Sequence, residues 1–177
     1  MAKRLTVHRT GRVPVWAAGL LLALLTASCG IYSFTGTSIQ PDVQSIAIHY
    51  FEYKALRVNP SLSNAMTEAM RDKFQKLTRL EQVEENGDLD LAADITGYDI
   101  KPMAVTAGEV ASQNRLTVTV KAYFINRKHS EDDWEKSFSA YADYDSQNSL
   151  DAVEATLCEE IIDKLVEDIF NAAVANW

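Results

Sequence analysis

A cysteine near the start of the chain follows a short apolar run, and its thiol has the clearest chemical role in the sequence. The run from Val15 to Leu25 holds eleven residues without a charge, and a basic segment without acids precedes it. This profile is typical of a secretory signal peptide. A membrane-spanning helix needs roughly 20 apolar residues to cross about 30 Å of hydrocarbon, so we expect this segment to be cleaved rather than to span.

The residues before Cys29 indicate what happens to its thiol. Thr26, Ala27 and Ser28 lead into Cys29, a sequence that resembles the lipobox of bacterial lipoproteins. The resemblance implies that residues 1–28 are a lipoprotein signal peptide and that Cys29 becomes the first mature residue. It would then carry a thioether-linked diacylglycerol and an N-acyl chain, with palmitate among the expected acyl groups. Two or more acyl chains attach a protein stably to a membrane. The alternative is a secreted protein with a free cysteine.

Residues 29–43 are predicted to be a lipidated N-terminus and a polar tether. Gly30 stands where an Asp would, in the enterobacterial sorting pattern, favour the inner membrane. By that resemblance we expect a lipid-anchored protein on the periplasmic face of the outer membrane. Fully extended at 3.3–3.6 Å per residue, the stretch from Ile31 to Val43 reaches roughly 45 Å.

Catalytic and metal-binding motifs are not visible in the sequence. Once Cys29 is acylated, Cys158 has no cysteine partner, and its neighbours on a predicted helix indicate a small core residue. His129 has no second histidine nearby, and the acids around Asn86-Gly87 lack the spacing of a calcium-binding loop. Phosphate-binding glycine loops and nucleophile elbows are also missing from the sequence. We predict a protein that is not an enzyme and that has no metal or cofactor.

Charge limits the choice of partners. Removing residues 1–28 removes four of the 17 Lys+Arg and none of the 25 Asp+Glu, which leaves a formal net charge of −12. Such a field repels nucleic acid at long range, so no nucleic-acid partner is expected. The best local basic patch for phosphate contacts consists of Arg115, Lys121, Arg127 and Lys128. The alternative is that these charges keep a sheet face or edge soluble.

Periodicity gives the expected elements. A period of two predicts strands at 45–53, 115–125 and 134–144, and two more on either side of Asn86-Gly87, which we expect to form a tight hairpin turn. Gly97 interrupts the alternation and indicates a β-bulge. Apolar stripes at helical spacing predict helices at 60–77, capped by Asn59 or Ser61, and at 150–173.

This order predicts an α+β two-layer sandwich over residues 44–177. We expect a four- or five-stranded, mostly antiparallel sheet with two helices packed on one face, in the order β-α-β-β-β-(β)-α. The other face of the sheet is left for solvent or a partner.

Four stretches resemble a known family over nearly the whole mature chain. They are "CGIYSFTGTSIQPDVQSIAIHYF", "NRLTVTVKAYF", "YADYDS" and "VEDIFNAAVANW". They are similar to the LptE family of lipopolysaccharide-assembly lipoproteins, in a divergent branch that ends in Ala-Asn-Trp. The motifs carry no chemistry of their own, so they indicate kinship rather than a site.

The resemblance implies an outer-membrane lipoprotein that binds the β-barrel LptD, plugs its lumen and helps to insert lipopolysaccharide into the outer leaflet. Arg115, Lys121, Arg127 and Lys128 then become candidate contacts for lipopolysaccharide phosphates, although a net charge of −12 opposes binding of this polyanion. One alternative is an envelope lipoprotein that binds lipid or solute without a barrel partner. Another is a purely structural lipoprotein.

Overall fold

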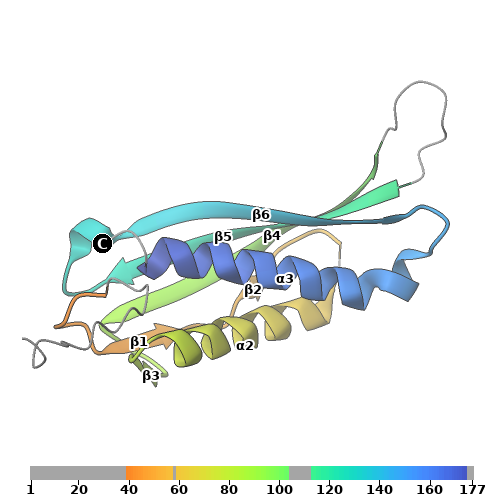
Figure 1. Cartoon of the computed structure of the whole chain (residues 1–177). Helices are drawn as coiled ribbons and strands as arrows, with labels where there is room; N and C mark the ends of the chain where they lie inside the picture. Colours follow the sequence, from red (N-terminus) through yellow and green to blue (C-terminus); the bar gives the residue numbers. More distant parts are fainter. Residues whose placement is uncertain (1–38, 58, 104–112, 175–177) are drawn as a thin grey trace, which may run out of the picture. The chain divides into compact units, whose positions relative to one another are not determined.

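The computed structural model describes residues 39–57, 59–103 and 113–174, so the predicted signal peptide and Cys29 lie outside the described residues. The described elements are β1 (Ser45–Ile48), β2 (Glu52–Tyr53), α2 (Pro60–Leu77), β3 (Glu81–Val83), β4 (Leu89–Met103), β5 (Gln113–Asn126), the 3-10 helix η2 (Ser130–Asp132), β6 (Trp134–Asp145) and α3 (Leu150–Val174). The predicted α+β architecture is confirmed (Figure 1). Within the described ranges, neither helix combines the length and apolar character that a membrane span requires.

The sheet has six strands in the order β3-β1-β4-β5-β6, with the short β2 paired to β4. The three long strands β4, β5 and β6 are antiparallel neighbours, whereas β1 runs parallel to both β3 and β4. The predicted strand at 45–53 is divided into β1 and β2, which both pair with β4. The parallel pairing of β1 and β2 makes the sheet mixed, and the division gives it six strands instead of the predicted four or five.

The predicted hairpin at Asn86-Gly87 is wrong. β3 and β4 are not bonded to each other, because β1 lies between them and runs parallel to both. Asn86 has the expected positive φ of 57°. Gly87, however, passes close to the backbone of β1: a Cβ built on it would lie 2.6 Å from the Ala47 nitrogen. Glycine is therefore needed at this position because the connection from β3 to β4 passes close to the backbone of β1, and not because it forms a tight hairpin turn.

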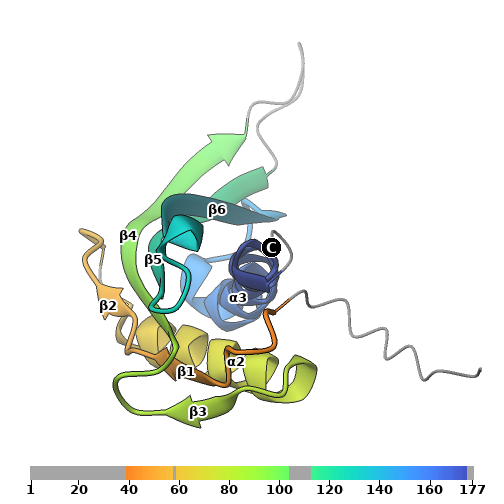
Figure 2. The same ribbon diagram turned by 90° about the vertical axis from the view of Figure 1, so that its left-hand side faces the viewer.

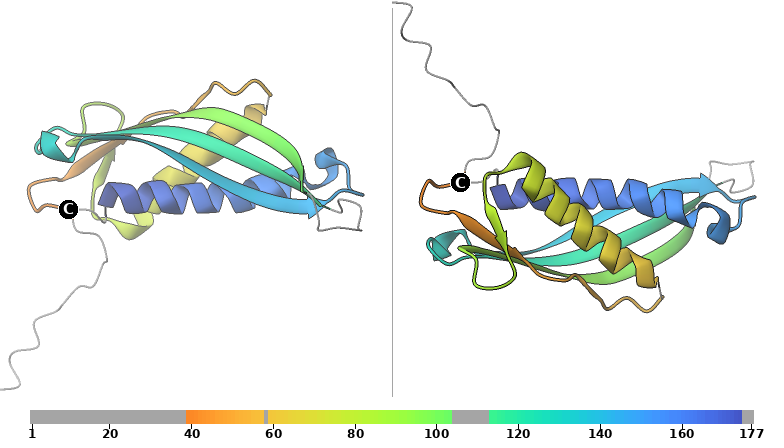
Figure 3. Two further views of the ribbon diagram at one scale, coloured as in Figure 1. Left: turned by 90° about the horizontal axis from the view of Figure 1, so that it is seen from above. Right: turned by 90° about the horizontal axis from the view of Figure 1, so that it is seen from below.

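Both helices cover the same face of the sheet (Figures 2 and 3). The chain enters α2 at Asn59, whose side chain accepts a hydrogen bond from the Ser61 backbone N–H, and Pro60 occupies the first turn, where no amide donor is required. α2 packs against α3 and the β1–β3 side, while α3 packs against β5 and β6. Figure 3 shows α2 crossing α3 obliquely, and the edge-on contact of Phe74 with Phe170 lies between them.

The core lies between the helices and the sheet. Alternate residues of β5, from Leu116 to Phe124, are fully buried or nearly so, as the pattern predicted. The register of β4 against β5 shifts between Ile95 and Gly97, which confirms the bulge predicted at Gly97. Because of this shift, β4 buries its odd-numbered apolar residues before the bulge and Tyr98 after it. The opposite side chains of β4, β5 and β6 point away from the helices.

Candidate functional site

The uncovered face of the sheet, which we call the outer face, carries two of the four candidate basic residues. It is formed by side chains that alternate with the buried ones along the three long strands. On β4 they are Asp90, Ala92, Asp94, Gly97, Asp99 and Lys101; on β5 they are Arg115, Thr117, Thr119, Lys121, Tyr123 and Ile125; on β6 they are Glu135, Ser137, Ser139, Tyr141, Asp143 and Asp145.

Arg115 makes the most geometrically defined ion pair on the outer face. It lies opposite Asp143 in the β5–β6 register, and its Nε and one terminal nitrogen donate to the two carboxylate oxygens at 2.7 and 2.8 Å. The guanidinium also stacks on Tyr141, 3.6 Å from the ring centroid. The carboxylate raises the pKa of Arg115, and the guanidinium holds the pKa of Asp143 below its usual value. The fork geometry and the stacking both require arginine at this position.

Lys121, six residues after Arg115 on β5, belongs to a second group of charges. Its Nζ is 2.5 Å from a carboxylate oxygen of Glu135, which raises the pKa of the lysine. Next to it, Asp94 accepts a hydrogen bond from the Tyr123 hydroxyl at 3.0 Å and pairs with Lys54 at 2.8 Å. Burial acts to raise the pKa of Asp94, but these contacts outweigh it and the pKa is lowered.

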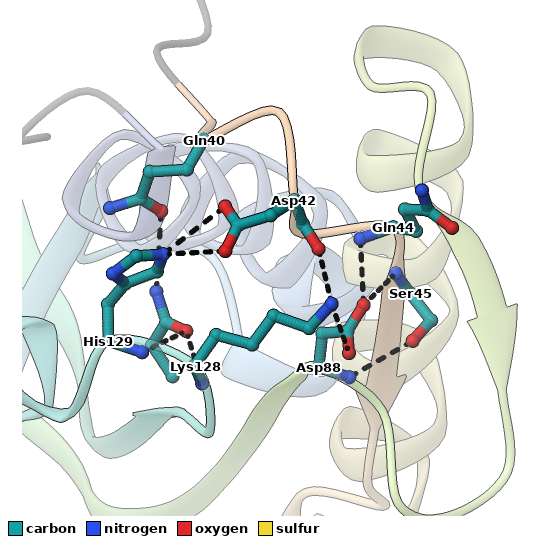
Figure 4. Close-up of polar contacts among 8 residues, drawn as sticks. Gln40, Asp42, Gln44, Ser45, Asp88, Lys128 and His129 are labelled. Carbon is teal, nitrogen blue, oxygen red and sulfur yellow. Dashed lines mark hydrogen bonds and ion pairs between the residues drawn. The ribbon is translucent and has the colours of Figure 1, made fainter.

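Arg127 and Lys128 lie in the turn after β5, at one end of the sheet. Arg127 Nε is 2.5 Å from Asp90, a carboxylate that is only 6% exposed and that also lies 3.0 Å from the His49 ring. Lys128 is 3.3 Å from Asp88 and donates to the Asp42 carbonyl oxygen, and the His129 ring is 3.0 Å from the Asp42 carboxylate (Figure 4). These three consecutive residues, which we call the basic turn, each pair with an acid from another part of the chain.

The acids that pair with the basic turn also fix the segment before β1, residues 39–44, to the rest of the domain. Asp88 accepts hydrogen bonds from the backbone N–H groups of Gln44 and Ser45 at 2.8 and 3.2 Å, and the Ser45 hydroxyl accepts one from the Asp88 N–H (Figure 4). The amide of Gln44 is the main cause of the lowered pKa of Asp88. A hydrogen bond with the His129 ring lowers the pKa of Asp42. Residues 39–43, which fall in the predicted tether, thus pack against the folded domain, with Val43 buried.

The structure therefore divides the predicted basic patch into separate groups. Six residues of extended strand place Arg115 and Lys121 about 20 Å apart, and Arg127 and Lys128 lie beyond the end of the strand. Each of the four candidates has a carboxylate partner. A phosphate group would have to compete with these carboxylates, so the phosphate-binding role stays a prediction. Sequence spacing alone gave no signal for the carboxylate partners, because each comes from another element.

Cys158 lies in a polar cluster that the sequence pattern did not predict. It is buried, as expected, with its sulfur 3.7 Å from both the Tyr98 hydroxyl and the Asn59 amide nitrogen. Both of these groups also donate to Glu154. Burial raises the pKa of the Cys158 thiol, which makes it unreactive. Over the described ranges, no group of three or more His, Cys, Asp and Glu side chains could hold a metal ion.

Sequence comparison gives one family. The model of the family described as "LptE: Lipopolysaccharide-assembly" matches residues 43–173, which is most of the chain and almost all of the described domain. No curated protein sequence matches the chain.

Solved structures of similar fold come from several bacteria. They include a Xanthomonas campestris protein of the DUF330 family (12% identity, TM-score 0.49, covering 75% of this chain and 87% of that one). They also include a minor lipoprotein from Acinetobacter baumannii (14%, 0.44, 68% and 89%) and rare lipoprotein B from Shewanella oneidensis (6%, 0.44, 69% and 89%). At these identities and TM-scores they add nothing to the assignment, which rests on the family match.

Proposed function

The chain belongs to the LptE family of lipopolysaccharide-assembly proteins, and on this premise we propose that it is the lipoprotein partner of an LptD-type β-barrel in the outer membrane. In this role it assembles with the barrel, plugs its lumen and supports insertion of lipopolysaccharide into the outer leaflet. The observation that carries the proposal is the family match over residues 43–173.

The proposed attachment to the membrane is through Cys29. The basic start, the short apolar run and the small residues before Cys29 support acylation of its thiol after cleavage at residue 28. Because several acyl chains hold a protein stably on a bilayer, the domain would stay on the periplasmic face without spanning the membrane. The eleven residues from Cys29 to Ile39 reach at most about 40 Å when fully extended, which keeps the domain near the barrel.

The proposed role is non-enzymatic. Cys158, the nucleophile that the sequence draws attention to, is buried and has a raised thiol pKa. On the outer face, Arg115 pairs with Asp143 and Lys121 pairs with Glu135, as expected for a surface that contacts a partner mainly through hydrogen bonds and shape.

The proposed function also includes direct contact between basic side chains of the chain and lipopolysaccharide phosphates. Arg115 has the best chemistry for it, because a guanidinium that already binds a carboxylate in a fork can bind a phosphate in the same geometry. The phosphate would replace Asp143 as the partner. Lys121, Arg127 and Lys128 would exchange Glu135, Asp90 and Asp88 in the same manner.

Co-purification tests the proposal. A tagged full-length chain is produced at native level in the bacterium that encodes it, the membranes are dissolved in detergent, and bound proteins are identified by mass spectrometry. We expect the endogenous LptD-type barrel in a one-to-one complex, and an intact mass that shows an acylated Cys29. The Cys29→Ala variant is the control, since it should lose the lipid and leave the membrane fraction. A correctly acylated chain that recovers no barrel would contradict the proposal.

A further inference from the structure

Charge is distributed unequally between the two sides of the domain. α3 contains seven acidic residues and one lysine, whereas β4, β5 and β6 together contain six acidic and four basic residues. On α3, the exposed Asp151, Glu159, Asp163 and Asp168 have no cationic partner among the described residues. α3 therefore contributes −6 to the −12 expected for the mature chain, whereas the three strands together contribute −2.

The middle of the outer face is uncharged and carries hydroxyl groups. Gly97, Thr119 and Ser139 lie side by side across the three strands. The Thr119 and Ser139 hydroxyl oxygens are 3.2 Å apart, and Thr117 and Ser137 lie on either side of them along the strands. The ion pairs Arg115–Asp143 and Lys121–Glu135 border this region.

Two large side chains extend from the outer face into solvent. Tyr141 is 46% exposed and lies beside the Arg115 guanidinium, and Ile125 is 47% exposed on the neighbouring strand, towards the basic turn. Exposed tyrosine and arginine side chains around a well-packed patch are frequent anchors of protein interfaces.

The size of the outer face suits a stable protein contact. β5 has 14 residues, so at about 3.3 Å per residue and about 4.8 Å between strands the three-stranded face measures roughly 46 by 14 Å. This is about 650 Å² before side-chain relief is included, compared with about 800 Å² per partner in a standard interface.

We propose that the outer face, and not α3, docks on the inner wall of the barrel partner, at a stretch of wall lined by uncharged hydrogen-bonding side chains. This inference rests on the proposed function and adds the contact surface to it. With the outer face docked, Arg115 and Lys121 keep their carboxylate partners, which leaves Arg127 and Lys128 beyond the end of β5 as the candidates for phosphate contact. Docking through α3 would remove four unpaired carboxylates from water, which is strongly unfavourable without matching cations. Docking through the outer face buries hydroxyl groups that can bond the wall and two balanced ion pairs, Arg115–Asp143 and Lys121–Glu135. Among the described residues, its charges without an ion-pair partner are fewer than those of α3 and of both signs: Asp99, Asp145 and Lys101. The acids of α3 then remain in water.

A matched pair of arginine substitutions tests the choice of face. Ser139→Arg places a bulky charge at the exposed centre of the outer face, and Thr156→Arg places the same charge on the exposed side of α3. Each variant is produced as the full-length lipoprotein and used to recover the barrel from detergent-dissolved membranes. We expect Ser139→Arg to lower the recovered barrel at least tenfold and Thr156→Arg to change it less than twofold. Full recovery with Ser139→Arg, or an equal loss with both variants, overturns the inference.

A second measurement does not depend on a bulky substitution being tolerated. A photo-crosslinking amino acid replaces Ser137 on the outer face or, as the matched control, Thr156 on α3, and the cells are irradiated. We expect a crosslinked product with the barrel from position 137 and none from position 156. The reverse pattern overturns the inference, and so does a product from both positions. If the unmodified chain recovers no barrel at all, the proposed function fails and this inference fails with it.

Discussion

The carboxylate of Asp88 fixes the segment that leads into β1 to the start of β4. It accepts from two backbone amides, those of Gln44 and Ser45, and pairs with Lys128. Amides and a lysine favour the ionised form, so the pKa of Asp88 is below its usual value. A depressed carboxylate pKa stabilises the folded state above the unfolded pKa, and this contribution disappears as the pH falls through the folded pKa.

Asp88→Asn is therefore expected to destabilise the protein in a pH-dependent way. At pH 7 we expect a loss of about 1–2 kcal/mol in the free energy of unfolding, the range for a charged acceptor of backbone amides that is partly exposed. The unchanged protein begins to lose this contribution below about pH 4 and loses all of it only when the pH falls below the lowered folded pKa, so the difference between the two proteins should shrink steadily in acid. Urea unfolding at a series of pH values from about 7 down to about 2 measures it. A difference that stays constant over this range would contradict the explanation.

Substitution of Ser63, unlike that of Asp88, is not expected to lower the free energy of unfolding. Its hydroxyl is buried in α2, and within the described part of the chain it has no hydrogen-bond partner. Ser63→Ala removes this polar atom and places a better helix former in the middle of the helix. We expect the free energy of unfolding to stay the same or to rise by up to about 1 kcal/mol. Thermal unfolding followed by circular dichroism checks it, and a fall of more than about 1 kcal/mol would show that the hydroxyl has a partner.

Among the helices and strands, the connection from β3 to β4 differs most from the prediction, because it crosses β1 instead of forming a hairpin. The chain must pass β1 closely on its way from one side of that strand to the other, and Gly87 is the point of contact. Atoms of a side chain at this position would meet the Ala47 nitrogen and the Leu89 carbonyl oxygen, both at 2.6 Å. Backbone atoms inside a sheet cannot move away as a flexible side chain can.

Gly87→Ala and Gly97→Ala should thus differ in their effect. For Gly87→Ala we expect a loss of at least about 2 kcal/mol in the free energy of unfolding, because backbone must shift. At Gly97 the added Cβ would meet the Thr119 side chain at 3.1 and 3.2 Å, which a small adjustment can relieve, so we expect a loss of about 1 kcal/mol or less. Urea midpoints of the two variants give the comparison. An equal or smaller loss for Gly87→Ala would contradict the crossover geometry.

The elements themselves were predictable because their signals are local. The stripe of α2 with Asn59 and Pro60 at its start, the alternation of β5 and the glycine at the bulge all show in short windows of sequence. Which strands pair was not predictable in the same way. Asn86-Gly87 favours a hairpin locally, but β1, more than thirty residues earlier in the chain, occupies the position between β3 and β4.

At the scale of the whole molecule, the candidate site could be predicted only in part. The alternation of buried residues in β5 indicates from the sequence alone that Lys121 faces away from the core, and it does lie on the uncovered face. It could not show that Asp143 and Glu135 would pair with Arg115 and Lys121, because those partners come from a separate strand through the register. Arg115 and Lys121 are thus neutralised, and the six acidic and three basic side chains of the outer face leave it with a formal charge of −3.

If the chain supports lipopolysaccharide export, depletion of the protein should stop lipopolysaccharide from reaching the cell surface. The gene is placed under a repressible promoter, and newly made lipopolysaccharide that reaches the cell surface is measured by surface labelling as the protein disappears. We expect surface arrival to fall in step with the protein and to recover when the unmodified chain is supplied again. Undiminished arrival of lipopolysaccharide at the surface in cells that no longer contain the protein would show that the chain has no role in this export.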